Sequence, residues 1–179
     1  MIRPLLILPL FVGLFSGCQK SDSAPVASAS PEKWQLVWHD EFDGSGVPDP
    51  AKWTYATGGH GWGNKEKQFY TAARPENANQ IDGKLHVIAR KESWEDNDYT
   101  SARVISRGMG DFQYGRFEIR AKVPAARGTW PAIWMMPSDW EFADGGWPDI
   151  GEIDIMEHVG HDPGVIHASA HSRDYQWQK

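Results

Sequence analysis

The chain has 179 residues and a formal net charge of −6 at neutral pH. This length allows one domain with a sizeable core and is too short for two domains of ordinary size. No stripe of Lys and Arg stands out, so nucleic acid is not an expected partner. Ten Trp exceed what a core of this size usually needs. Indole rings fill cores and also stack on the apolar faces of sugars, and composition alone leaves both uses open.

The N-terminus has the features of an export signal. Arg3 precedes the apolar run Leu5–Phe15, which is too short to span a bilayer as a stable helix. Cys18 follows directly and is the only cysteine, as in a bacterial lipobox. We therefore expect a lipoprotein-type signal peptide over 1–18, lipid attachment at Cys18, and a place in the bacterial cell envelope, at the outer membrane, or secretion. An ordinary signal peptide with an incidental cysteine is the alternative. No disulfide is expected.

The rest of the chain divides into a tether and one domain. Residues 19–32 are rich in Ser, Ala and Pro, a composition that cannot build a core and predicts a flexible linker. From residue 33 to 179, short alternating segments are separated by turn residues, and no long helical period appears. This pattern predicts an all-β sandwich or barrel. We expect the domain to be monomeric.

Four segments are predicted to be strands: Trp34–Trp38, Lys84–Ala89 after Asp82-Gly83, Gly115–Val123 and Trp130–Met136. The third alternates most clearly, with one apolar and one polar face. Its polar face either lines a cleft or is a solvated exterior. Its apolar residues are Phe117, Ile119, Ala121 and Val123, and its polar residues are Arg116, Glu118, Arg120 and Lys122.

Three acids, Glu152, Asp154 and Glu157, lie within six residues. On a regular strand, Glu152 and Asp154 share a face and Glu157 has the wrong parity. One β-bulge near Ile155-Met156 would bring all three to one side. The two glutamate carboxyls could then approach to about 5–6 Å, close to the separation that a retaining glycosidase needs.

Crowding of these carboxylates predicts that at least one pKa is raised. A protonated acid can then donate to a leaving-group oxygen while an ionised neighbour attacks. The acidic pattern by itself also fits a solvated strand face or a site for a hard cation.

The segment Trp147–His158, which contains the three acids, resembles the signature of family 16 glycoside hydrolases. The resemblance is closest to the laminarinase-like subgroup of endo-β-1,3-glucanases, which has the bulge. Four further blocks occur in the family's order, and the resemblance as a whole extends over nearly all of 34–177. They are residues 38–42, 61–71, 114–122 and 128–137.

The resemblance implies a concanavalin A-like jelly-roll sandwich of two antiparallel sheets with a concave substrate cleft. It implies that Glu152 is the nucleophile, Asp154 its helper and Glu157 the general acid/base. The implied reaction is retaining endo-hydrolysis of β-1,3- or mixed β-1,3/1,4-glucan, with no cofactor required. The implied sugar-binding residues are Asn64, Glu118, Arg120, Trp130, Trp134, Trp147 and His171.

Family members often hold a structural calcium, and Glu41 and Gly83 match the regions that supply two of its ligands. The family's late strands would follow residue 179, so we expect the domain to be incomplete at its C-terminus. Two other functions remain open. One is a non-catalytic β-glucan-binding module, although all three acids are present. The other is a galactan hydrolase of the agarase or carrageenase kind.

Overall fold

The computed structural model describes residues 34–139 and 145–175. Within these residues every regular element is a strand, which confirms the all-β class. None of the described segments forms an apolar helix long enough to cross a bilayer. The elements described below belong to the unit that begins at Trp38, and Trp34–Val37 fall outside that unit. The predicted signal peptide, the tether and Cys18 lie outside the described residues.

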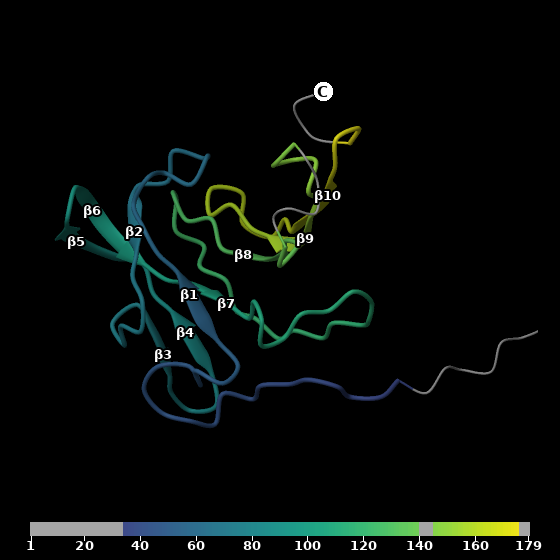
Figure 1. Ribbon diagram of the computed structural model, residues 1–179. Coiled ribbons are helices and arrows are strands. Elements are labelled where there is room, and N and C mark those ends of the chain that lie inside the picture. Colours follow the sequence, from purple (N-terminus) through teal and green to yellow (C-terminus); the bar gives the residue numbers. More distant parts are fainter. Residues whose placement is uncertain (1–33, 140–144, 176–179) are drawn as a thin grey trace, which may run out of the picture. The chain divides into compact units, whose positions relative to one another are not determined.

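In the described part of the unit that begins at Trp38, ten strands form four small sheets (Figure 1). One sheet pairs β1 (Thr54–Ala56) with β7 (Arg103–Ile105), and another pairs β3 (Ala78–Gln80) with β4 (Leu85–Val87). A third has the order β2-β6-β5, made of Gln68–Tyr70, Asn97–Ser101 and Arg90–Trp94. The fourth has the order β10-β9-β8, made of His167–His171, Glu152–Glu157 and Ala132–Met135. Pairing is antiparallel throughout except between β2 and β6, which run parallel.

Two of the predicted strands are confirmed. Lys84–Ala89 contains β4, and Trp130–Met136 contains β8. Asp82 and Gly83 have φ of 52° and 65°, and the residues on either side of them exchange two backbone hydrogen bonds of 3.0 and 3.2 Å. These are the features of a two-residue type I′ turn, which joins β3 to β4 as a hairpin.

The prediction of a strand at Trp34–Trp38 is wrong. The segment contains no strand, and Trp34, Leu36 and Val37 are all exposed. Alternating apolar residues favour an extended backbone, but a strand is stabilised by its ladder and by packing of one face. Trp38 packs against the rings of Trp53 and Phe112, but the segment forms no ladder with a described strand.

The prediction of a strand at Gly115–Val123 is also wrong, because this segment forms no ladder with any described strand. Figure 1 draws it within the long connection between β7 and β8, which carries no arrow. The predicted apolar face is nevertheless present. Its four apolar residues line one cavity of about 340 Å³ together with Ile133, Ile155, Met156 and Ile166. Alternation therefore predicted which side chains share a face, but could not say whether the backbone would find a partner.

The most buried part of the first half is polar. Asn77 and Thr100 are both fully buried, and the Asn77 amide bonds the Thr100 hydroxyl at 2.9 Å. Arg74 donates to Asn77 at 3.0 Å and pairs with Glu92 at 2.7 Å. Because buried polar groups are costly unless they are paired, this closed network fixes how β3, β5 and β6 meet.

Candidate active site

Strand β9 contains the bulge that the acid spacing predicted. Trp134 of β8 pairs with Asp154, and the neighbouring Ile133 pairs with Met156. One step along β8 therefore corresponds to two along β9, and Ile155 is the additional residue. The pairing of β9 with β10 shifts over the same stretch. The expected bulge near Ile155-Met156 is confirmed.

The register also shows which way the acids face. Residues directly opposite on neighbouring strands share a face, and alternate residues of one strand do so as well. Successive β10 partners of the three acids lie two positions apart, so all three acids lie on one face of the sheet. The partners of Glu152, Asp154 and Glu157 are His171, Ser169 and His167.

Each acid is held by a different aromatic side chain. The indole of Trp147 donates to Glu152 Oε2 at 2.6 Å, and the indole of Trp130 donates to Glu157 Oε1 at 2.9 Å. Asp154 is 4% exposed, and its Oδ2 lies 2.9 Å from His171 Nε2. Charge-assisted hydrogen bonds of this kind orient a carboxylate and stabilise its ionised form. The acids are thus fixed separately while sharing one surface.

Burial raises the pKa of Glu152 above the usual glutamate value. The hydrogen bond from Trp147 acts in the opposite direction, and the neighbouring Asp154 carboxylate raises the pKa further. The sequence predicted such a rise from crowding of the carboxylates, but burial is the larger cause here and the Asp154 carboxylate the smaller one. The acid with the raised pKa is Glu152, which the family resemblance implies is the nucleophile.

The turn before β9 aims the first acid. Ile150 is 2% exposed and anchors the turn in the core. Gly151 follows with φ of 79°, a conformation that residues with a side chain rarely adopt. Its N–H donates to the Pro148 carbonyl at 3.0 Å. This compact turn brings Trp147 back over Glu152, five residues later in the chain.

A close approach of two loops helps to position Glu157. The N–H of Gly160 donates to the Thr129 carbonyl at 2.9 Å. A Cβ at Gly160 would overlap the carbonyl oxygen of Ala126, so only glycine fits at this contact. The next residue after this turn is Trp130, which donates to Glu157. Gly160 therefore sets the position of the indole that orients Glu157.

Asn64 is connected to this sheet through a chain of side-chain contacts. Its amide lies 3.4 Å from Glu66 Oε1, which in turn lies 3.7 Å from the Arg103 guanidinium. Arg103 stands over the ring of Trp134 at 5.0 Å and over that of Trp62 at 4.3 Å. Because Trp134 shares the face of the acids, these groups extend the site toward β2 and β7.

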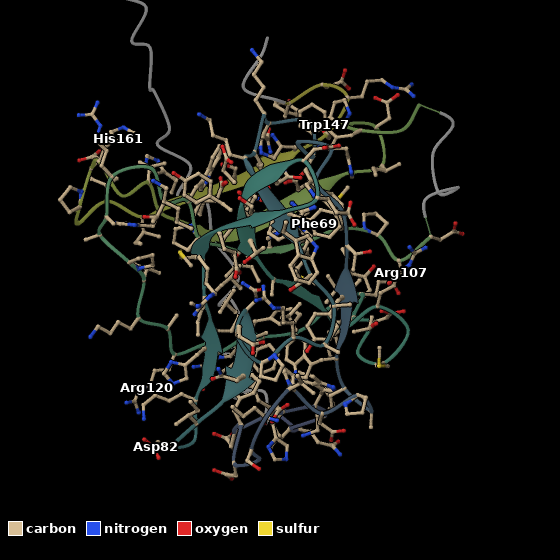
Figure 2. All side chains as sticks on the ribbon, turned by 90° about the vertical axis from the view of Figure 1, so that its left-hand side faces the viewer. Phe69, Asp82, Arg107, Arg120, Trp147 and His161 are labelled. Atoms are coloured by element: carbon tan, nitrogen blue, oxygen red, sulfur yellow. The ribbon has the colours of Figure 1, made fainter. Side chains whose placement is uncertain are left out.

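The structure does not bring Glu118 and Arg120 to the acids. Glu118 pairs with Arg116 at 2.5 Å, and its side chain is 73% exposed. Arg120 is exposed as well. Figure 2 shows Arg120 far below Trp147, which donates to the first acid. A sugar-binding role for these two residues stays a prediction.

The two residues expected near calcium do converge. A Cβ built on Gly83 would lie 3.9 Å from the Glu41 carbonyl oxygen and 3.5 Å from Asp43 Oδ1. Carbonyl and carboxylate oxygens are the donors that Ca²⁺ prefers, so these residues fit such an ion.

Sequence reasoning missed Arg103, Glu66 and His167. Glu66 accepts a bond of 2.6 Å from the Tyr70 hydroxyl, and burial raises the pKa of that hydroxyl to about 12. His167 is the direct partner of Glu157 across the sheet. A basic residue inside the short apolar run of β7 was a usable signal for Arg103. His167 follows from the parity of His171 on the same strand.

Comparisons with known proteins identify the family of this chain. A family model described as "Glycosyl hydrolases family 16" matches residues 65–178. The beta-glucanase of Rhodothermus marinus is 52% identical over 176 residues, which cover 98% of this chain and 59% of that protein. A glucan endo-1,3-beta-glucosidase of Cryptopygus antarcticus is 43% identical over 143 residues, covering 77% of this chain and 51% of that protein.

Among solved structures, the laminarinase from Rhodothermus marinus matches with a TM-score of 0.78 and 57% identity, covering 80% of this chain and 57% of that one. The jelly-roll fold expected from the sequence is confirmed over the matched part. The chain spans between half and three fifths of the length of these relatives. With a family model that covers most of the chain and half of the residues identical to a relative, this protein belongs to the glycosyl hydrolases of family 16.

Proposed function

We propose that this protein hydrolyses β-1,3- or mixed β-1,3/1,4-glucan internally, with retention of anomeric configuration. One observation carries the proposal: Glu152, Asp154 and Glu157 share one face of a bulged strand, and each has its own orienting partner. The relatives named as glucanases support the choice of a glucan over a galactan.

In the proposed reaction, Glu152 attacks the anomeric carbon while Glu157 donates a proton to the leaving oxygen. A covalent glycosyl–enzyme ester forms, and Glu157 then removes a proton from the water that hydrolyses it. The nucleophile must be ionised, and the hydrogen bond from Trp147 favours its ionised form. This bond offsets part of the effect of burial, and the net direction of the Glu152 pKa is still upward.

Asp154 would act through the two groups beside it. Its carboxylate faces His171 on one side and couples to Glu152 on the other. An imidazole held by a carboxylate keeps a fixed orientation and tautomer. We expect Asp154 to separate the titrations of the two glutamates and to hold the nucleophile in place.

Substrate would lie over the aromatic side chains of this face. Trp130 is 56% exposed and Trp147 is 39% exposed, so their rings are accessible to the apolar faces of sugars. Trp134, His171 and Asn64 would add contacts along the same face, with Glu118 and Arg120 proposed as further partners for sugar hydroxyls.

The proposal is tested by incubating the full chain with laminarin, lichenan, agarose and carrageenan and measuring reducing ends. Release from laminarin or lichenan is expected, and Glu152→Gln should abolish it. The first anomer seen by proton NMR should have the β configuration. Equal inertness of wild type and variant, with both still binding laminarin, would instead establish a glucan-binding module. Release from agarose or carrageenan alone would establish a galactan hydrolase.

We also propose a structural calcium held by the carbonyl oxygens of Glu41 and Gly83, with Asp43 beside them. The ion would tie the chain near residue 41 to the β3–β4 hairpin. Adding Ca²⁺ to protein treated with EGTA should raise the melting temperature, and Asp43→Ala should reduce the rise. An unchanged melting temperature in wild type would reject the site.

Export and anchoring by a lipid on Cys18 are proposed from the sequence alone. The support is the basic residue, the short apolar run and the cysteine directly after it. Expression of the full chain in a bacterium with labelled palmitate should label the protein and place it in the membrane fraction. Cys18→Ser should abolish the label, and a label that persists in this variant would reject the assignment.

A further inference from the structure

A mixed nitrogen and oxygen cluster lies at the centre of the acid-bearing face. One carboxylate oxygen each from Glu152 and Asp154, together with one ring nitrogen of His171, all lie within 4.8 Å of one another. Glu152 and His171 are direct partners across β9 and β10. Strands hold such side chains more precisely than loops do.

The histidine of this cluster is nine-tenths buried, with 10% of its side chain exposed. Its Nδ1 is buried and has no hydrogen-bond partner among the described residues. Its other nitrogen, Nε2, is directed at Asp154, which is 4% exposed. The ring of Trp147 lies 5.8 Å from the imidazole and limits its rotation. The imidazole is therefore held with one nitrogen directed into the cluster.

This donor set selects among metals. Imidazole nitrogen with carboxylate oxygen suits Zn²⁺ and Cu²⁺, whereas Mg²⁺ and Ca²⁺ favour sites made of oxygen alone. Zn²⁺ binds nitrogen and oxygen at about 2.0–2.2 Å, so a tetrahedral site needs its donors about 3.3 Å apart. The Asp154 and His171 donors are 2.9 Å apart, and all three donors lie within 4.8 Å of one another. Side-chain movements of up to about 1.5 Å would therefore bring all three donors to the ion.

We propose that Glu152, Asp154 and His171 form a Zn²⁺ site that competes with substrate. The bound ion replaces the proton shared by Asp154 and His171 and takes an oxygen of Glu152 as its third ligand. A fourth position remains for water. Inhibition of hydrolysis by zinc rests on the proposed function, because it requires Glu152 to act as the nucleophile. The metal site itself does not depend on that function.

The site is tested by calorimetric titration of ZnCl₂ into the full chain. The protein is first stripped of metals and then kept in buffer that contains Ca²⁺. One Zn²⁺ per chain is expected, with no heat from Mg²⁺. His171→Gln should weaken binding by at least about tenfold through loss of the nitrogen ligand. His161→Gln is the matched control, since His161 is exposed and lies well apart from Trp147 in Figure 2. Equal zinc affinity in wild type and His171→Gln would overturn the proposal.

A second measurement needs no substitution. In NMR spectra of wild type with labelled histidines, Zn²⁺ should shift the ring-nitrogen signals of one of the seven histidines before those of the others. A soluble β-glucan oligosaccharide should reverse this zinc-induced shift. A uniform shift of all histidines would overturn the site. Zinc should also inhibit laminarin hydrolysis, with recovery on adding EDTA. Because calorimetry detects binding without turnover, an inactive protein that binds zinc would reject the proposed function and leave the site standing.

Discussion

The buried amide of Asn77 should contribute more to stability than any exposed polar group nearby. Its side chain makes four hydrogen bonds, to Thr71 at 2.8 Å, Arg74 at 3.0 Å, Thr100 at 2.9 Å and the Ile88 carbonyl at 3.1 Å. Asn77→Ala removes all four. At about 1 kcal/mol for each bond, the variant should lose about 4 kcal/mol of unfolding free energy.

Asn79→Ala is the matched control: Asn79 lies two residues further along the chain, in β3. Asn79 makes one hydrogen bond, at 2.6 Å to the Pro75 carbonyl, and its Oδ1 is buried without a partner. Removing it should cost less than about 1 kcal/mol, because an unpaired oxygen is removed together with that bond. Urea unfolding followed by Trp fluorescence measures both, provided that the slopes agree. Two variants within 1 kcal/mol of each other would refute the reasoning about the buried network.

Two further predictions concern the site. Burial raises the pKa of Glu152, so kcat/KM of the wild type should fall as the pH decreases through that raised value. Trp147→Phe removes the N–H that favours the Glu152 carboxylate, so this acid limb of the pH profile should move to higher pH. The lost hydrogen bond should also reduce kcat/KM about tenfold, and an acid limb that stays in place would contradict the assignment. Gly160→Ala should cost about 1–3 kcal/mol and reduce kcat, since its Cβ would overlap the Ala126 carbonyl beside Trp130. If Gly160→Ala melts at the same temperature as the wild type, the two loops can move apart without loss of stability.

The acid-bearing strand could be predicted because its geometry depends on parity. Side chains alternate strictly along a strand, so the spacing of Glu152, Asp154 and Glu157 either separates the acids or requires a bulge. The pairing partner of a strand has no comparable local signal. The parallel pairing of β2 with β6 joins segments about thirty residues apart, and nothing within either segment indicates the other.

The same distinction explains the two wrong strands. At Gly115–Val123 the alternation correctly grouped the apolar side chains, because side-chain direction alternates along an extended backbone. Pairing depends on a second segment, which the pattern does not describe. The Arg103 contacts were missed for a related reason: Trp62 and Glu66 reach the guanidinium from one part of the chain and Trp134 from another.

Because of the additional residue in β9, the strand with Ile155 and a strand one residue shorter would aim the acids in the same direction. With Ile155 absorbed outside the ladder, Glu157 faces the same way as Glu152 across five positions of sequence. Deleting that one residue would leave a regular strand in which the last acid comes four positions after the first, again with matching parity. A strand of this kind can gain or lose one residue at the bulge without turning an acid into the core, whereas the same change between Glu152 and Asp154 would reverse one of them.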